Sequence, residues 1–205
     1  MAAEPGGSQP APRRVRNWAR KLGFHQMWQI GVVVVLAATA AFGGLDTVNT
    51  KVTPMTAGEP FHDGEFAITI QRATAVRELR ANGTLVGPPA PGYYYLGVVA
   101  AVRNDGSVPG QLRNEIDLHG LPDSQFLDTF RMSDGSQLSA LGPGLTETVA
   151  FVWKVPEKGL QANSKTVTLR VWHKKYTEYS VNYGKGWIES LDQYGEVELP
   201  VKVAP

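Results

Sequence analysis

Hydrophobic and polar positions alternate along much of the chain after residue 61, with the period of two that is typical of half-buried β-strands. The clearest alternation covers residues 65–71, 93–103, 146–155, 166–172 and 197–203. In residues 93–103 apolar side chains occupy both faces, which indicates a central strand. Charged residues interrupt a weaker alternation in residues 111–118 and 125–132. The pattern predicts roughly seven short strands.

Turn-forming residues separate these predicted strands. Clusters of Gly, Pro, Asn and Asp occupy residues 81–92, 104–106, 134–135 and 141–145, and Lys158-Gly159 follows Pro156. Pro200 cannot donate a backbone hydrogen bond, so it predicts that the last strand lies at a sheet edge. No long amphipathic pattern interrupts the strands. Residues 61–205 are therefore predicted to form an all-β, antiparallel immunoglobulin-like β-sandwich.

Residues 27–45 form an uncharged, strongly apolar stretch of nineteen residues. A helix of this length covers about 28 Å, close to the hydrocarbon thickness of a bilayer. The sequence therefore predicts one transmembrane helix that anchors the sandwich. Its characteristic residues are Met27, Trp28, Val32, Val33, Val34, Val35, Leu36, Phe42 and Leu45.

The flanks of this stretch differ in charge, which predicts its orientation. Five cations precede it and only Glu4 opposes them: Arg13, Arg14, Arg16, Arg20 and Lys21. The positive-inside rule then places the N-terminus in the cytoplasm and the C-terminal domain outside a single-pass cell membrane. A cleavable signal peptide, cut near Ala40, is the alternative, and it places the same domain outside.

The segments on either side of the predicted helix lack a strand or helix period. Residues 1–26 read as a disordered and basic cytoplasmic leader, and residues 46–60 as an extracytoplasmic neck. The leader's cations serve topology, and no nucleic-acid partner is expected. Beyond the helix the charge balance is about −3, although the whole chain carries +1. A mildly acidic exterior requires any recognition to be local.

The sequence contains no recognisable motif of catalytic or metal-binding residues. There is no cysteine, so disulfides and thiolate chemistry are excluded. No serine lies in a nucleophile-elbow motif, and the three histidines beyond residue 46 are scattered. The Asp-Gly pairs lack the alternating oxygen ligands of a calcium loop, and no zinc-ligand spacing occurs. We therefore expect no enzymatic activity, no metal and no cofactor.

Aromatic residues gather in and next to residues 174–195. They are Trp172, Tyr176, Tyr179, Tyr183, Trp187 and Tyr194. Tyr and Trp are enriched at binding surfaces because they bury a large area at small entropic cost, so this segment is the candidate partner-binding site. The alternative is structural: Tyr179, Val181 and Tyr183 alternate as ordinary strand residues, and Trp187 and Leu191 cap the open end of the sandwich.

Two sequence stretches resemble a known group of domains. YYYLGVVAAVRNDGS and LGPGLTETVAFVWKVP, together with one N-terminal span and a Thr/Pro-containing neck, are similar to immunoglobulin-like extracytoplasmic domains of unknown function in Gram-positive, and especially actinobacterial, envelope proteins. These resemble in outline the immunoprotective extracellular protein of mycobacteria. The resemblance covers residues 57–203 and implies a sandwich that works by binding. The long segment 174–195 departs from it.

Two functions remain open at this point. The chain is expected to be an accessory subunit that binds another membrane or cell-wall protein, such as a transporter, or alternatively a module that binds a small molecule or glycan. An exposed apolar patch on one sheet or on residues 174–195 favours the first, and a concave pocket lined by aromatic side chains favours the second.

Overall fold

The computed structural model describes residues 50–163, 165–178 and 184–204. The described residues belong to one compact unit, residues 49–205. The predicted leader, the predicted membrane span and the basic residues that orient it lie outside the described residues. So do Tyr179 and Tyr183. Within the described part of the chain, no helix is both long enough and apolar enough to cross a bilayer.

Strands dominate the described residues, and one short helix interrupts them. In chain order they are β1 (Lys51–Pro54), β2 (Pro60–His62), β3 (Phe66–Val76), β4 (Leu79–Ala81), β5 (Thr84–Gly87), β6 (Tyr93–Asn104), β7 (Gly110–Gln111), β8 (Asp117–His119), β9 (Gln125–Arg131), β10 (Ala140–Leu141), β11 (Thr146–Pro156), α3 (Glu157–Ala162), β12 (Thr166–Glu178) and β13 (Lys185–Val203).

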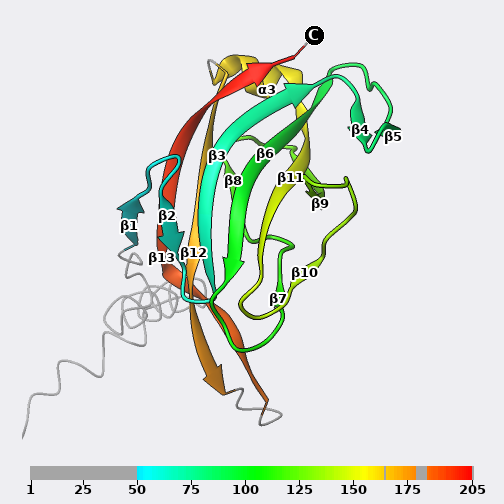
Figure 1. The fold of residues 1–205 in the computed structure, drawn as a ribbon. Helices are drawn as coiled ribbons and strands as arrows, with labels where there is room; N and C mark the ends of the chain where they lie inside the picture. The colour runs from blue at the N-terminus through cyan, green and yellow to red at the C-terminus, as the bar shows by residue number, and fades with distance from the viewer. Residues whose placement is uncertain (1–49, 164, 179–183, 205) are drawn as a thin grey trace, which may run out of the picture. The chain divides into compact units, whose positions relative to one another are not determined.

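The strands form a β-sandwich with one core (Figure 1). Hydrogen bonding joins them in the order β8-β12-β13-β3-β6-β11-β9, with β1 beside β13 and β2 beside β3. The path folds over, so that the buried faces of β12 and β13 meet those of β3, β6 and β11. β13 belongs to both layers, because it pairs with β12 along most of its length and with β3 only at residues 201–203. The predicted all-β sandwich is confirmed.

Alternate positions of β6 and β11 form the centre of the core. β6 lies between β3 and β11, as its two apolar faces predicted. The two strands pair in register, with Val98 opposite Phe151 and Leu96 opposite Trp153. The buried positions are Tyr94, Leu96, Val98, Ala100 and Val102 on β6 and Val149, Phe151, Trp153 and Val155 on β11. The predicted inward faces of both strands are thus confirmed.

A β-bulge extends β3 beyond the predicted strand. Phe66, Ile68 and Ile70 are buried as predicted, but the register with β6 then shifts between Ile70 and Arg72. One extra residue moves the buried face from even to odd positions. Ala73 and Ala75 are therefore the next core residues. A fixed period of two could not show this continuation.

The predicted neck is partly a strand. Lys51–Pro54 form β1 and pair in parallel with residues 193–196 of β13. The Met55 backbone N–H then donates to the Glu196 carbonyl at 2.8 Å, and the Met55 side chain packs against the core. All four β1 residues are exposed, so no hydrophobic alternation marks this strand. The domain thus begins before residue 61.

Two other local predictions were wrong. Residues 111–118 do not form one strand: only Gln111 and residues 117–118 belong to strands, and the connection between them buries Leu112 and Ile116. Lys158-Gly159 is not a turn but part of α3, which buries Leu160. Both segments are short, and each packs on the core through only one or two apolar residues. So few buried positions cannot produce a hydrophobic periodicity in the sequence.

Pro200 does not mark a sheet edge, because β13 has neighbours on both sides. The Val201 backbone N–H points toward β12, where it donates to the Lys165 carbonyl at 2.7 Å. The backbone nitrogens of successive residues point to opposite sides of a strand, so the Pro200 nitrogen points away from β12. That side is unpaired there, since β1 pairs only as far as Glu196 and β3 begins to pair at Val201. The proline lies where β13 crosses between the layers.

Candidate functional site

The β12–β13 hairpin extends beyond the adjacent ends of β3 and β6 (Figure 1). Its inner part pairs from Thr166–Pro200 to Trp172–Tyr194, and its outer part from Lys174–Glu189 to Glu178–Lys185. Between these parts residues 190–193 lie opposite His173 alone, so a large bulge separates them. We call residues 174–178 and 184–193 the outer hairpin. It contains most of the aromatic segment predicted to bind a partner.

Four of the predicted aromatic residues form two cross-strand pairs. The rings of Trp172 and Tyr194 lie 4.8 Å apart at 61°, and those of Tyr176 and Trp187 lie 5.2 Å apart at 60°. Edge-to-face aromatic pairs of this kind stabilise a sheet beyond the area that they bury. The structure therefore brings these four residues together in pairs along one hairpin.

Trp187 and Tyr194 are held by their surroundings. A Cβ atom on Gly106 would lie 3.1 Å from Trp187 Nε1, and one on Gly64 would lie 3.5 Å from the Trp187 ring, so the indole packs on two glycines. Tyr194 is 6% exposed, and the Arg170 guanidinium lies 4.5 Å from its ring centre. These two aromatic residues mainly stabilise the hairpin.

Exposed apolar side chains lie on the outer hairpin. Tyr176 is 38% exposed, Ile188 44% and Leu191 87%. Leu191 was expected to cap the sandwich in the structural alternative, and that expectation was wrong: it lies in the bulge, where Ser190 Oγ donates to Asp192 Oδ1 at 2.6 Å. The sequence reasoning did not single out Ile188. The signal was available, because Ile188 is a large apolar residue followed by Glu189 and Ser190, and alternation places it on the face opposite Trp187.

A hollow of about 530 Å³ lies beside these apolar residues. It is lined by His173, Lys174, Lys175, Thr177, Ile188, Glu189, Ser190 and Gln193. The outer hairpin thus offers protruding apolar side chains next to a concave surface with charges of both signs. Such a combination suits a protein surface better than a small apolar ligand.

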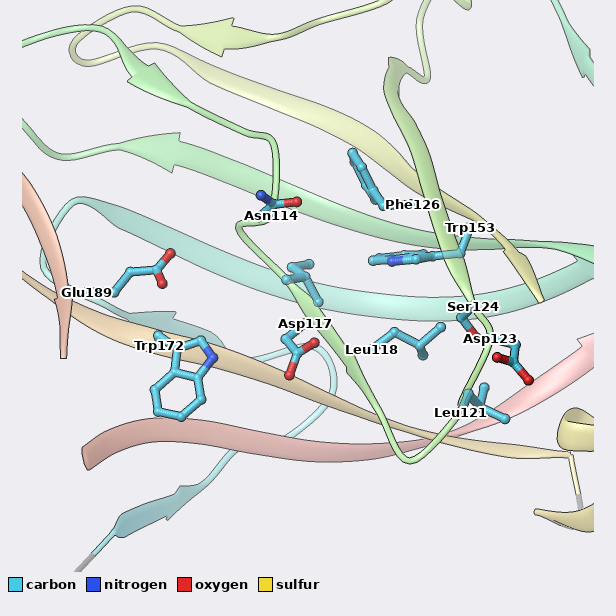
Figure 2. Close-up of a pocket in the computed structure, with 11 residues that line it drawn as sticks. Asn114, Asp117, Leu118, Leu121, Asp123, Ser124, Phe126, Trp153, Trp172 and Glu189 are labelled. Carbon is cyan, nitrogen blue, oxygen red and sulfur yellow. The ribbon is translucent and has the colours of Figure 1, made fainter. Parts of the chain in front are cut away.

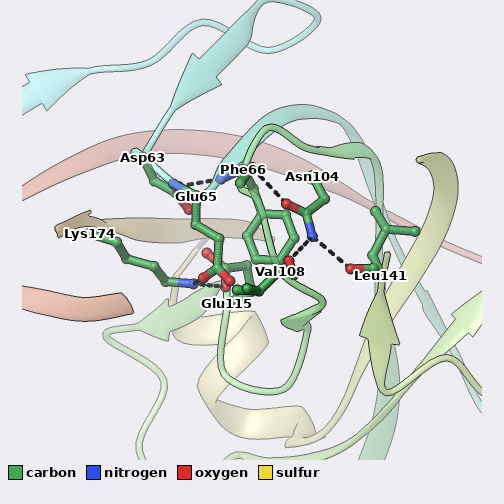
Figure 3. A network of polar contacts seen from close by, with 9 residues as sticks. Asp63, Glu65, Phe66, Asn104, Val108, Glu115, Leu141 and Lys174 are labelled. Carbon is green, nitrogen blue, oxygen red and sulfur yellow. Dashed lines mark hydrogen bonds and ion pairs between the residues drawn. The ribbon is translucent and has the colours of Figure 1, made fainter. Parts of the chain in front are cut away.

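A buried cluster of four ionisable groups fixes the base of the outer hairpin (Figure 3). Asp63, Glu65 and Glu115 are 1%, 5% and 3% exposed. Lys174, from β12, donates through Nζ to Glu65 Oε2 at 2.8 Å and also to Glu115 Oε2. Buried charges are stable only when they are paired and hydrogen-bonded, which this lysine provides for two carboxylates.

The same cluster ties the backbone of the β2–β3 connection to β12. Asp63 Oδ1 accepts hydrogen bonds at 2.6 Å from the backbone N–H groups of both Glu65 and Phe66. The Lys174 backbone N–H donates to the Asp63 carbonyl at 2.6 Å. A side chain at Gly64 would overlap the Lys174 carbonyl, so this close approach requires glycine there.

Burial and neighbouring charges shift the titration of this cluster. Burial raises the pKa of the Glu115 carboxyl well above its usual range, and the Asp63 side chain adds to the effect because it can accept a hydrogen bond only from the protonated form, whereas the Lys174 charge opposes it. Burial alone would lower the pKa of Lys174, but Glu115, Glu65 and Asp63 outweigh it and raise that pKa. The lysine therefore stays charged, while Glu115 favours its protonated form.

A pocket of about 440 Å³ opens between the two layers, near β8 and β9 (Figure 2). Trp172 and Glu189 lie at one end, Asp123 and Ser124 at the other, and Phe126 and Trp153 line one side. The remaining lining residues are Asn114, Ile116, Asp117, Leu118 and Leu121. The pocket thus combines aromatic side chains with three carboxylates. Of the predicted site residues it contains only Trp172.

Metal ligands do not cluster in the described part of the chain, where no group of three or more His, Cys, Asp or Glu residues could hold an ion.

No family model and no curated protein matches the sequence. Two solved structures are similar in fold. An uncharacterized β-sandwich protein from Clostridium difficile 630 has a TM-score of 0.47 at 14% identity, covering 74% of this chain and 98% of that one. A conserved hypothetical protein from Bacillus anthracis has a TM-score of 0.33 at 15% identity, covering 65% and 94%.

Proposed function

We propose that this chain is a membrane-anchored, non-enzymatic envelope protein whose extracytoplasmic, immunoglobulin-like sandwich binds another membrane or cell-wall protein as an accessory subunit. The uncharged residues 27–45 and the basic residues before them support the anchor and its orientation. The partner contacts the outer hairpin. A transporter or a cell-wall enzyme is the expected kind of partner for a domain held close to the outer face of the membrane.

One observation carries this proposal: three large apolar side chains are exposed on a hairpin that extends beyond its neighbours. Tyr176, Ile188 and Leu191 are too exposed to contribute much to the core. Exposed apolar groups gathered on one element mark interaction sites more often than scattered single residues do. The cross-strand pairing holds the hairpin rigid before a partner arrives, which reduces the entropic cost of binding.

Site-specific photo-crosslinking from the outer hairpin tests the proposal. A photoreactive residue at Leu191 in the full-length chain in its native membrane is expected to trap one defined protein. Ile188→Ser combined with Tyr176→Ser is expected to reduce the yield at least tenfold, because it removes an exposed apolar side chain from each face of the outer hairpin, and a few such contacts contribute most of the affinity of an interface. Leu145→Ser is the matched control, since Leu145 is 57% exposed on a different connection. An undiminished yield in the double variant would contradict the proposal.

The pocket near β8 and β9 supports a second candidate function, the binding of a small molecule or glycan. Asp117, Asp123 and Glu189 line it, and no ion pair involves them among the described residues. Arg170 lies opposite Asp117 across the β8–β12 pair, but its guanidinium contacts Glu196 at 2.7 Å. Phe126 and Trp172 supply surfaces on which a sugar ring can stack. A cationic amino sugar suits this lining.

Binding of glucosamine oligomers, compared with their N-acetylated forms, tests the second candidate. The two ligands share a shape and differ in charge, so the acidic lining is expected to favour the amine. Chemical-shift changes in the NMR spectrum at Trp172 and Phe126, lost in Asp117→Asn, would support it. Equal or absent changes with both ligands would contradict it.

A further inference from the structure

We propose that a proton shared between Asp63 and Glu115 locks the outer hairpin to the sandwich, so that the hairpin loosens and partner binding weakens as the pH rises. The statement about binding rests on the function proposed above, whereas the lock itself does not. The lock joins three segments that are distant in the sequence: the β2–β3 connection, the β7–β8 connection and β12.

The geometry leaves two carboxyl oxygens without a partner. In the described structure Asp63 Oδ2 and Glu115 Oε1 are buried and accept no hydrogen bond. The other oxygens of both groups are satisfied, by the backbone at Asp63 Oδ1 and by Lys174 at Glu115 Oε2. Both carboxyl groups belong to the buried cluster around Lys174 (Figure 3). A proton on one carboxyl turns two opposed acceptors into a donor and an acceptor.

Charge leads to the same assignment. Asp63, Glu65 and Glu115 are three acids around one lysine, so full ionisation would leave a buried charge of −2 (Figure 3). Two carboxylates in one buried cluster cannot both ionise at low cost, since a like charge disfavours the second ionisation. A shared proton reduces the excess charge from −2 to −1 and keeps both hydrogen bonds of Lys174, to Glu65 and to Glu115.

The other groups that face the cluster do not supply this proton. From β3 the Phe66 ring lies 4.8 Å from Lys174 Nζ, and from β13 the uncharged Trp187 packs on Gly64. Past the end of β6, Asp105 and Gly106 donate only backbone N–H groups, to the Glu65 carbonyl. Arg103 and His62 both contact the Asp105 carboxylate and face solvent. His62 is therefore replaced as a control in the test.

The lock acts on the outer hairpin because Lys174 is its first residue. The backbone hydrogen bond from Lys174 to Asp63 and the packing of Trp187 on Gly64 hold both strands of the hairpin against the β2–β3 connection. When the shared proton leaves, Asp63 and Glu115 repel each other at this junction. The repulsion is relieved if the β2–β3 and β7–β8 connections move apart, which breaks up the cluster that holds Lys174 and the base of the hairpin.

The sign of the pH effect follows from the raised pKa of Glu115. Because the folded pKa lies above the usual value of 4.5, the stabilisation is fully present below about 4.5 and is lost as the pH rises through the folded value. One proton changes the opening equilibrium by at most about tenfold per pH unit. The hairpin is therefore held most firmly in mildly acidic surroundings.

Hydrogen exchange of the outer hairpin in the full-length chain tests the lock. After correction for the intrinsic exchange rate, protection at residues 174–178 and 185–189 is expected to fall as the pH rises in the unchanged protein. Glu115→Gln and Asp63→Asn each replace the shared proton with an amide hydrogen, so each is expected to keep protection and remove its pH dependence. In the double variant two amide NH₂ groups face each other, and low protection at every pH is expected. His62→Gln should leave the pH dependence unchanged.

Two outcomes would overturn the lock: pH-dependent protection that persists in Glu115→Gln, or protection in the unchanged protein that does not fall with pH. If the variants do not fold, the carboxyl carbon shifts of Asp63 and Glu115 in the unchanged protein still decide, because a shared proton is excluded if both groups are ionised at the acidic pH where protection is highest. The exchange measurement needs no partner. If photo-crosslinking fails while exchange still depends on pH, only the proposed function is refuted. If photo-crosslinking succeeds but does not depend on pH, only the coupling of the lock to binding is refuted.

Discussion

Asn104 shows how one buried amide joins separate parts of the sandwich. The residue ends β6 and has no exposed surface. Its Nδ2 group donates to the Val108 carbonyl at 2.9 Å and to the Leu141 carbonyl at 2.7 Å, and its Oδ1 accepts from the Gly106 backbone N–H at 2.8 Å. The side chain thus satisfies three backbone groups, two in the β6–β7 connection and one on β10, which no apolar residue could do.

Asn104→Ala is therefore expected to lower the free energy of unfolding by about 3 kcal/mol, because buried backbone groups lose their partners. Urea denaturation measures the change. Asn163→Ala is the control: its amide makes one long contact of 3.4 Å at the surface, to the Gly120 carbonyl. If the two variants lost equal stability, the account of Asn104 would be wrong.

At the residue scale the sequence predicted apolar burial well and polar burial poorly. The inward faces of β6, β11 and β12 followed from alternation alone. Asp63, Glu65 and Glu115 could not be recognised as buried, because their partner Lys174 lies 109 residues from Glu65 and 59 from Glu115. Acidic residues next to glycine or asparagine are typical of exposed turns. Only tertiary structure shows that these particular acids face a lysine.

At the scale of elements, strand existence was predictable and strand neighbours were not. A bulge in β3, the crossing of β13 between layers and the large bulge in the hairpin all change register without changing composition. The β4–β5 hairpin is different, because its signal was present and was interpreted only as a turn. Asn82 and Gly83 have φ values of 48° and 77°, as a type I′ turn requires, and Asn-Gly favours this turn.

Gly83→Ala is expected to lower the free energy of unfolding by about 1 kcal/mol, because a side chain disfavours the left-handed backbone conformation. Gly97→Ala provides the comparison. Gly97 lies within β6 without a positive φ, and the nearest atom to an added Cβ there, the Thr74 carbonyl oxygen, is 3.9 Å away. That substitution should raise stability by about 0.5 kcal/mol, since it restricts the unfolded chain. Changes of the same sign in thermal unfolding would contradict this explanation.

At the scale of the whole molecule, the predicted sandwich is present, but its strand pairs are not all antiparallel. β1 and β3 both pair in parallel with β13. These pairings link the start of the domain and its first long strand to its last strand, which is far from both in the sequence. Local patterns carry no information about such contacts, so the sequence placed residues 46–60 outside the domain. The structure assigns residues 51–55 to it.

The position of the domain boundary leads to a last prediction. A fragment of residues 49–205 is expected to unfold at the same urea concentration as the full-length chain, because residues 49–205 form a compact unit with their own core. A fragment that begins at residue 60 loses β1, the Met55 contact with Gly195 and the Gly58 backbone hydrogen bond to Ile70. It should be less stable by about 3 kcal/mol, the usual cost of removing a packed methionine side chain. Met55→Ala in the longer fragment distinguishes the contribution of the Met55 side chain to the free energy of unfolding from the contribution of β1. Equal midpoints for both fragments would show that residues 51–55 are only a neck, as the sequence pattern alone predicted.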